Sequence, residues 1–366
     1  MTMRERLLAM LEGRKPDRVP FVQYAGLAAP DEEVWALVGR ENMGLLAWCN
    51  LHWFEHPNCG FETVESEESG RPVRRTTLHT PQGSLEAKWA QNEIAWARQE
   101  DYVKEPDDYR VLLSYLRDIV VHPATEGWLD LYRRLGDDGL PHTSVGRTPY
   151  QALWIEWVRL DDLVFHMADC PELMAEVFAE LFALQHRTFL VIAEAVRDLP
   201  VPYIVFPDNI TAPTIGEPYF RKYCLPSYRD LAECLAGTGK AVPVAVHMDG
   251  DLKPLWQAIA ESPVGVLDSL SPPPDNDTSA ADAIRLWPEM RLGVNFPSSV
   301  HLAGEKTVYD TAAEILEQAG HTGRLWIQIS ENLPPGAWRR SYPQIVRAIR
   351  DLAPGRMGTE ETAQKA

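Results

Sequence analysis

Short apolar runs with the composition of β-strands alternate with helix-like segments along most of the chain, and this alternation most constrains the fold. The strand-like runs fall at 18–23, 140–145, 203–206, 242–246, 264–267, 291–295 and 325–329. Helix-like segments lie between them, at 31–39, 107–117, 171–196, 218–235, 252–260, 280–286, 307–318 and 342–352. Roughly eight strands with helices between them predict an α/β fold, a single (β/α)8 TIM-type barrel. A doubly wound open sheet is the alternative, weakened because no glycine-rich nucleotide-binding turn follows the first strand.

Residues 61–89 break this alternation. Polar and apolar residues alternate there in three runs, separated by turn signals at 69–70 and 80–83. We interpret the segment as a small antiparallel β-hairpin insertion near the N-terminus. The chain of 366 residues suits one barrel with such an insertion. The predicted domain therefore spans 1–355, and 356–366 form a flexible polar tail.

Particular residues indicate how two of the expected helices begin, bend or end. The helix expected at 218–235 contains Pro226, which should kink it. The penultimate helix begins with Thr307 and Asp310, which suit a capping box, and Gly320 suits its C-terminal cap.

The charge balance is acidic, with 53 Asp and Glu residues against 35 Lys and Arg residues and a formal net charge of −18. Nucleic acids and anionic membrane surfaces attract basic patches, so we expect neither as a partner. No apolar run approaches the ~20 residues needed to span a bilayer, and residues 1–14 indicate an amphipathic helix instead of a signal peptide. Five scattered cysteines are typical of a reduced compartment, so we predict a cytoplasmic protein. A homodimer is compatible with these features.

Two strand-like runs end in side chains that can ligate a metal. The run at 242–246 leads to His247 and Asp249, and the run at 325–329 leads to Glu331. In a β/α barrel the carboxyl ends of different strands converge on one mouth, where active sites lie. We therefore expect His247, Asp249 and Glu331 to form a three-ligand zinc site with an open coordination position. The alternative is a histidine hydrogen-bonded to a carboxylate without metal.

Other polar residues at strand ends are candidates for substrate contacts. The whole set is Tyr24, Asp208, Asn209, His247, Asp249, Asp268, Asn295 and Glu331. Together with His247, Asp208 suits a catalytic role as general acid or base, although Asp-Asn is also a common turn. We expect Tyr24, Asn209 and Asn295 to position a substrate. Arg147 could bind a substrate anion or form a structural salt bridge, and any one strand-end residue could simply cap a helix.

Several short motifs follow one another in a defined order. They lie at 4–6, 15–20, 80–85, 219–226, 239–250 and 333–335. In this order they resemble the uroporphyrinogen decarboxylase superfamily, from about residue 4 to about residue 352, and the resemblance implies a single β/α barrel. True decarboxylases of that family carry an arginine-rich loop after the first strand, whereas residues 23–29 contain no arginine. The chain is therefore more similar to the corrinoid-dependent methyltransferase branch, of the O-demethylase-like kind.

That resemblance also bears on the metal site. Thiol-methylating members of the branch hold zinc with an H-x-C-G motif and a later cysteine before Pro-Pro. Here His247 is kept, while Asp249 and Glu331 stand in place of the two cysteines. Such an oxygen-rich set is compatible with zinc as a Lewis acid on a methyl ether. The resemblance then implies transfer of a methyl group from a small methoxylated substrate to the cobalt(I) corrinoid of a separate carrier protein.

Two alternatives remain open. One is a metal-independent decarboxylase or lyase that acts on a smaller acid and uses Asp208. The other is a non-catalytic barrel that binds a corrinoid protein or a small ligand. Metal content separates the methyltransferase from both alternatives, and turnover separates the alternatives from each other.

Overall fold

Eight parallel strands close into a barrel at the centre of the computed structural model, which describes residues 1–92, 95–331 and 333–353. The order around the barrel is β1-β14-β13-β12-β11-β10-β9-β2. These strands are β1 (Phe21–Tyr24), β2 (Gly44–Trp48), β9 (Gly139–Ser144), β10 (Ile204–Phe206), β11 (Val244–Met248), β12 (Val264–Leu270), β13 (Arg291–Asn295) and β14 (Leu325–Ile329). Every neighbouring pair is parallel. The predicted barrel is confirmed, and the open-sheet alternative is wrong.

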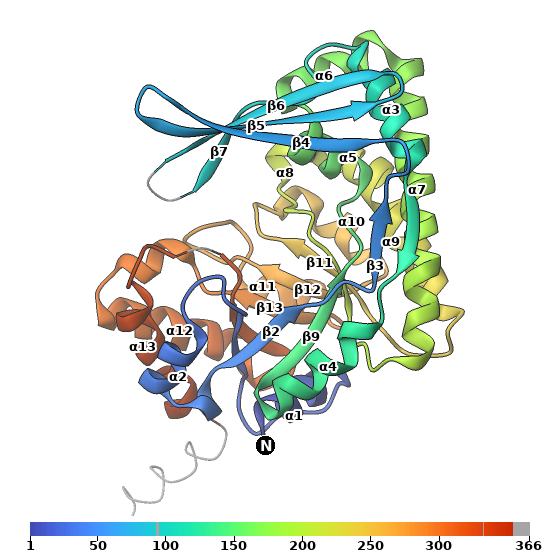
Figure 1. Ribbon diagram of the computed structural model, residues 1–366. Helices are drawn as coiled ribbons and strands as arrows, with labels where there is room; N and C mark the ends of the chain where they lie inside the picture. The colour runs from blue at the N-terminus through green and yellow to red at the C-terminus, as the bar shows by residue number, and fades with distance from the viewer. Residues whose placement is uncertain (93–94, 332, 354–366) are drawn as a thin grey trace, which may run out of the picture.

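Helices surround the barrel (Figure 1). They include α2 (Asp31–Val38), α3 (Asp108–Asp118), α4 (Glu126–Leu135), α5 (Pro149–Ala152), α6 (Leu160–Asp169), α7 (Pro171–Asp198), α8 (Ala212–Tyr219), α9 (Leu225–Ala236), α10 (Trp256–Ala260), α11 (Ala280–Leu286), α12 (Glu305–Ala319) and α13 (Trp338–Asp351). Their apolar faces pack on the outer side of the strands and form the larger core. Within the described residues, no helix has the length and apolar character needed to cross a membrane.

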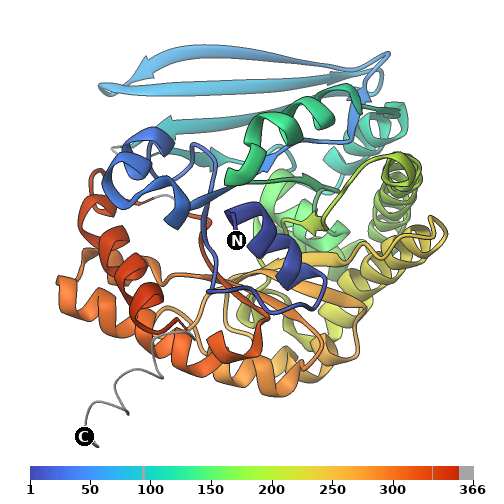
Figure 2. The same ribbon diagram turned by 90° about the horizontal axis from the view of Figure 1, so that it is seen from below.

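The first helix, α1 (Met3–Leu11), covers the end of the barrel where the strands begin (Figure 2). Its buried residues Met3, Leu7 and Met10 share a second core cluster with Val22 and Leu46 of the barrel strands. Because this end is filled by apolar side chains, the open mouth is the opposite end, where the strands finish.

The insertion is larger than the sequence predicted. It is a four-stranded antiparallel sheet of β4 (Gly60–Glu68), β5 (Arg71–Thr80), β6 (Gly83–Gln91) and β7 (Trp96–Glu100), in that order. A short ladder of β3 (His52–Glu55) and β8 (Val120–Pro123) connects it to the barrel. The predicted range 61–89 therefore missed the fourth strand. The sheet extends beyond the end of the barrel opposite α1 (Figure 1).

Two helix details differ from the sequence predictions. A π-helical turn, η4 (Phe220–Cys224), comes before Pro226. Helix α9 starts directly after this turn and has Pro226 in its first turn. Proline is tolerated there because the missing N–H would have no helical partner. Helix α12 starts at Glu305 without a side-chain cap, so the predicted capping box of Thr307 and Asp310 is wrong.

Two other boundary predictions have different outcomes. Gly320 is the C-terminal cap of α12, as predicted. The polar tail predicted at 356–366 lies outside the described residues.

Candidate active site at the barrel mouth

Side-chain alternation along the barrel strands decides which candidate residues reach the interior. On β11, Val246 packs in the outer core, whereas Ala245 lies in the inner cluster. His247 has the same parity as Ala245, so it points into the barrel at the mouth. On β12, Asp268 follows the inward-facing Val266 in the same way.

His247 and Asp249 form an ion pair at the mouth. The His247 Nε2 lies 3.4 Å from Asp249 Oδ2, and the two side chains are 12% and 22% exposed. His247 Nδ1 lies 2.9 Å from the Asp268 carbonyl oxygen and 2.9 Å from the Ser269 amide nitrogen. These backbone contacts hold the ring with Nε2 toward Asp249.

The charges of this pair stabilise each other. Burial alone would lower the pKa of His247, but the hydrogen bond and charge of Asp249, with the charge of Asp268, raise it to about 9. Burial would raise the pKa of Asp249, but its interaction with His247 lowers it below the usual value. Without a metal ion, the pair is therefore an imidazolium and a carboxylate at neutral pH, and an ion bound at His247 Nε2 would displace the proton from that nitrogen.

A glycine brings the Asp249 loop close to its neighbour. A Cβ atom at Gly250 would lie 2.2 Å from the Cβ atom of Thr211. Ile210 donates its N–H to the His247 carbonyl at 3.2 Å, and Gly250 donates to the Ile210 carbonyl at 3.1 Å. The loops after β10 and β11 therefore form one hydrogen-bonded unit, and this unit positions Asp249.

Glu331, the third predicted ligand, is held by two neutral donors. Asn295 Nδ2 donates to Glu331 Oε1 at 3.0 Å, and Ser298 Oγ donates to Oε2 at 2.6 Å. Both carboxylate oxygens are thus oriented by residues at and after the end of β13. Asn295 therefore positions Glu331, and its predicted contact with substrate stays a prediction.

A hydrogen-bond path joins Glu331 to His247. Asn295 Oδ1 accepts from the amide and hydroxyl of Ser330, at 3.0 and 3.1 Å. Ser330 Oγ lies 3.0 Å from Ser269 Oγ, which in turn lies 3.5 Å from His247 Nδ1 and can accept from its N–H. The ends of β11, β12, β13 and β14 are therefore linked in one polar network.

The three predicted ligands fit a metal only in part. His247 oriented by a backbone carbonyl is the arrangement that zinc-binding histidines use, and Asp249 already faces its Nε2. The ligand atoms of His247, Asp249 and Glu331 do not all lie within 4.8 Å of one another. Coordination by all three would require the strand end that carries Glu331, together with its donors Asn295 and Ser298, to move closer to His247.

A buried polar layer lies inside the barrel below this network. Asp268 Oδ1 accepts from Tyr24 at 3.0 Å and from Gln328 at 2.6 Å. His142 Nδ1 lies 3.1 Å from the Tyr203 hydroxyl. Asp268 Oδ2 and His142 Nε2 are buried without a hydrogen-bond partner among the described residues. Because both atoms are buried, this layer is a polar part of the barrel interior and not an open surface.

Sequence reasoning missed most of this layer. His142, Tyr203 and Gln328 lie inside strand-like runs and are separated by long stretches of chain, so only the period-two alternation of each strand could have indicated them. Trp48, at the end of β2, also borders this layer. Its ring lies 5.4 Å from the Tyr24 ring and 3.8 Å from the His142 ring, and it is 42% exposed.

Asp208 does not lie with these groups. It is 0% exposed, and it accepts from the Thr148 amide at 2.7 Å and from the Tyr228 hydroxyl of α9 at 2.6 Å. Burial raises the pKa of Asp208 to about 6, against the opposing effect of these two hydrogen bonds. The carboxylate thus ties β10 to its surrounding helices. Asn209 is exposed at a left-handed φ of 54°, as in a turn.

Arg147 makes the structural salt bridge that was the alternative to anion binding. Its Nη1 lies 3.1 Å from Glu156 Oε1, and it lines a cavity of about 130 Å³ together with Trp157 and Gln185. Its positive charge also helps to lower the pKa of Asp249. Arg147 therefore affects the mouth through its electric field.

A larger cavity, of about 310 Å³, lies elsewhere in the molecule. Val19, Leu316, Leu325 and Ile349 line it, with Lys15 at its edge. These residues lie at the end of the barrel where the strands begin. This cavity is therefore separate from the mouth.

Comparisons with known proteins agree with the fold. Residues 170–351 match the family model described as Uroporphyrinogen decarboxylase (URO-D). A solved structure, a methyltransferase from Methanosarcina mazei, matches with a TM-score of 0.55 and 12% sequence identity, over 96% of this chain and 99% of that chain. At that identity the likeness shows the fold alone. A comparison with curated protein sequences gave no match.

Proposed function

We propose that the protein is a corrinoid-dependent methyltransferase of the demethylating kind. It would take a methyl group from a small methoxylated compound and give it to the cobalt(I) corrinoid of a separate carrier protein. The observation that carries the proposal is the His247–Asp249 pair at the mouth of a closed barrel, joined by a polar network to the carboxylate of Glu331. The fold likeness to a methyltransferase supports the same class of reaction.

We assign His247 and Asp249 to a zinc ion, with Glu331 as the third ligand. When bound, the ion would polarise the ether oxygen of the substrate, so that the oxygen leaves as an alkoxide or phenolate. Asn295 and Ser298 hold the Glu331 carboxylate in one orientation. The Asp268 carbonyl holds the imidazole of His247.

The inner polar layer is suited to orient the substrate. Asp268 Oδ2 is buried, so a hydroxyl or amine of the substrate could donate to it only if the side chains that cover it moved aside. Burial and the charge of Asp268 raise the pKa of Tyr24 well above its usual value, so its hydroxyl stays protonated and donates to Asp268. Trp48 presents a half-exposed indole at the rim, against which an aromatic substrate can stack.

The carrier would approach from the mouth, because α1 fills the other end of the barrel. The metal-free lyase alternative requires an accessible Asp208. That carboxylate is fully buried, with hydrogen bonds to Thr148 and Tyr228, so its placement does not favour the alternative.

The test is methyl transfer to cobalt(I) cobalamin from a panel of methoxylated aromatic compounds, followed by the absorbance of methylcobalamin. We expect wild-type protein with zinc to turn over at least one compound, and His247→Ala and Asp249→Asn to lose at least about 100-fold of that rate. His79→Ala, on the exposed insertion, is the matched control. Full activity of His247→Ala would overturn the assigned mechanism.

A further inference from the structure

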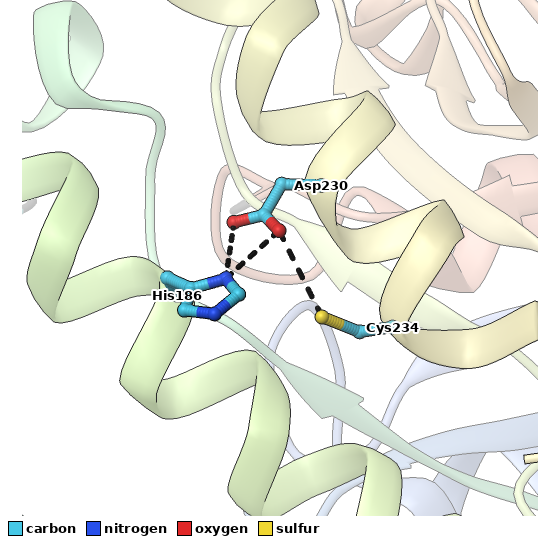
Figure 3. Close-up of side chains that lie close together, drawn as sticks. All are labelled: His186, Asp230 and Cys234. Atoms are coloured by element: carbon cyan, nitrogen blue, oxygen red, sulfur yellow. Dashed lines mark hydrogen bonds and ion pairs between the residues drawn. The ribbon is translucent and has the colours of Figure 1, made fainter. Parts of the chain in front are cut away.

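Far from the mouth, three potential metal ligands face one another across the neighbouring helices α7 and α9 (Figure 3). His186 Nδ1 on α7 lies 2.9 and 3.0 Å from the two carboxylate oxygens of Asp230 on α9. Cys234 Sγ, one turn further along α9, lies 3.8 Å from Asp230 Oδ1. All three ligand atoms fit within 4.8 Å of one another, the only such group in the part of the chain that the structure describes.

We propose that His186, Asp230 and Cys234 bind a zinc ion that clamps α7 to α9. Zinc bonds of ~2.0–2.3 Å at tetrahedral angles place neighbouring ligand atoms roughly 3.3–3.6 Å apart. The His186–Asp230 separations of 2.9 and 3.0 Å and the Asp230–Cys234 separation of 3.8 Å fall on either side of that range. The ligand atoms of His186 and Cys234 lie within 4.8 Å of each other, so binding would draw the three side chains together around the ion. A thiolate with an imidazole and a carboxylate favours zinc over magnesium or calcium, which prefer all-oxygen sites.

Hydrogen bonds between α7 and α9 already fix the positions of the three ligands. Asp230 and Cys234 are four residues apart on α9 and so project from one face of the helix. One residue before His186, Gln185 accepts a hydrogen bond from Ser227 of α9 at 2.6 Å. Further along, Arg197 of α7 donates to the carbonyl of Gly237 at 3.1 Å. Bonds on both sides of the cluster therefore set the register of the two helices, and the ligands stand on rigid elements.

The charge and exposure of the cluster also suit a cation. Among the described residues, His186 is the sole ion-pair partner of Asp230, and no lysine or arginine lies within 4.0 Å of that carboxylate. The side chain of His186 is 51% exposed and that of Asp230 is 32% exposed. An ion can therefore enter directly from solvent, and water can complete its shell. On binding, the Cys234 thiol would lose its proton to solvent and form a sulfur–metal bond.

This proposal is independent of the proposed function, and one spectroscopic probe separates the two. Cobalt(II) bound to a thiolate gives a sulfur-to-metal charge-transfer band in the near ultraviolet. The ligands assigned at the mouth contain only nitrogen and oxygen, so that band reports on the α7–α9 cluster alone. We expect titration of metal-free full-length protein with cobalt(II) to give the band, saturating within two equivalents because the mouth can also take up cobalt(II), and zinc to abolish it.

Single-residue variants show whether Cys234 or another cysteine supplies the thiolate that gives the band. Cys234→Ser should remove the band and weaken zinc binding at least about 100-fold, because the loss of a direct ligand costs no less than the loss of a supporting one. Cys170→Ser, at the start of α7, should leave both unchanged. Zinc should also raise the melting temperature of His247→Ala protein, in which the mouth lacks its imidazole, but not that of the double variant His247→Ala/His186→Ala. Absence of the band in wild-type protein, or its persistence in Cys234→Ser, would overturn the proposal.

Discussion

At the scale of single residues, neutral hydrogen-bond donors fix the carboxylates at the mouth. Asn295 and Ser298 hold both oxygens of Glu331, and Tyr24 and Gln328 hold one oxygen of Asp268. Neutral donors orient a carboxylate without cancelling its charge, so the carboxylate can still attract a metal ion or a donor group of the substrate. The residues around the ligands are therefore part of the site.

Removal of one such donor should weaken the metal site without unfolding the barrel. In Ser298→Ala, Glu331 loses the 2.6 Å hydrogen bond to its Oε2. We expect zinc affinity at the mouth to fall about 10–100-fold, as for other supporting residues of metal sites. Competition with a chelator in a Cys234→Ser background measures this. The neighbouring Ser299, which bonds Asp275, provides the control Ser299→Ala, and equal affinities in the two variants would contradict the role of Ser298.

Buried histidines make the stability of the fold sensitive to acid. His301 is 0% exposed, its Nδ1 lies 2.7 Å from the Ser341 hydroxyl, and burial lowers its pKa to about 4. The folded value lies below the unfolded value of 6.5, so the unfolded chain binds more protons as the pH falls from 6.5 toward 4. The contribution of neutral, buried His301 to the free energy of unfolding is fully present above pH 6.5, and about 2 kcal/mol of it is lost by pH 5.

The corresponding variant is His301→Gln, which cannot titrate in this range. We expect its free energy of unfolding, measured with urea, to fall between pH 7 and pH 5 by about 2 kcal/mol less than that of the wild type. His321→Gln, at an exposed position, should follow the wild type. An unchanged pH dependence in His301→Gln would show that His301 does not titrate as described.

At the scale of elements, the loops that follow β10 and β11 act together. They share backbone hydrogen bonds between Ile210, His247 and Gly250, and Thr211 packs where a side chain at Gly250 would lie. Asp249 precedes Gly250 directly, so its position depends on this contact. The fixed arrangement of the two loops is therefore as important for the site as the identity of the acidic residue that they position.

Gly250→Ala tests this coupling. The new methyl group would overlap Thr211 and separate the loops, so we expect a loss of stability of about 1–3 kcal/mol, as for overpacking, together with a loss of methyl transfer. Gly60→Ala, where no atom lies within 4 Å of the added carbon, is the control. Urea unfolding and the methylcobalamin assay check the two effects. Normal activity in Gly250→Ala would contradict the coupling.

The sequence predicted the barrel and the place of His247 at the end of one of its strands, because the apolar run that forms a strand is a local signal. It could not place Asp208, since a residue just after a strand can face either the mouth or the outer helices. The pairing of Asp208 with Thr148 and Tyr228 depends on contacts across the fold. The contact of Tyr24 with Asp268 joins residues 244 positions apart, which no local pattern indicates.

At the scale of the whole molecule, the two ends of the barrel have different chemistry. Helix α1 fills one end with apolar side chains, while the other end collects the carboxylates, the imidazole of His247 and the indole of Trp48. The four-stranded insertion extends on the same side as the mouth (Figure 1). The carrier protein proposed above would therefore have one end available at which a methyl group could be transferred.

The most direct measurement follows a carbon-13 label from the methoxy group of a substrate identified in the screen. Metal-free, zinc-restored and His247→Ala proteins would each be incubated with it and cobalt(I) cobalamin. We predict labelled methylcobalamin from the zinc-restored protein, and none above background from the metal-free protein or from His247→Ala. Label that appears as carbon dioxide, or transfer that is equal with and without zinc, would contradict a zinc-assisted methyl transfer at His247.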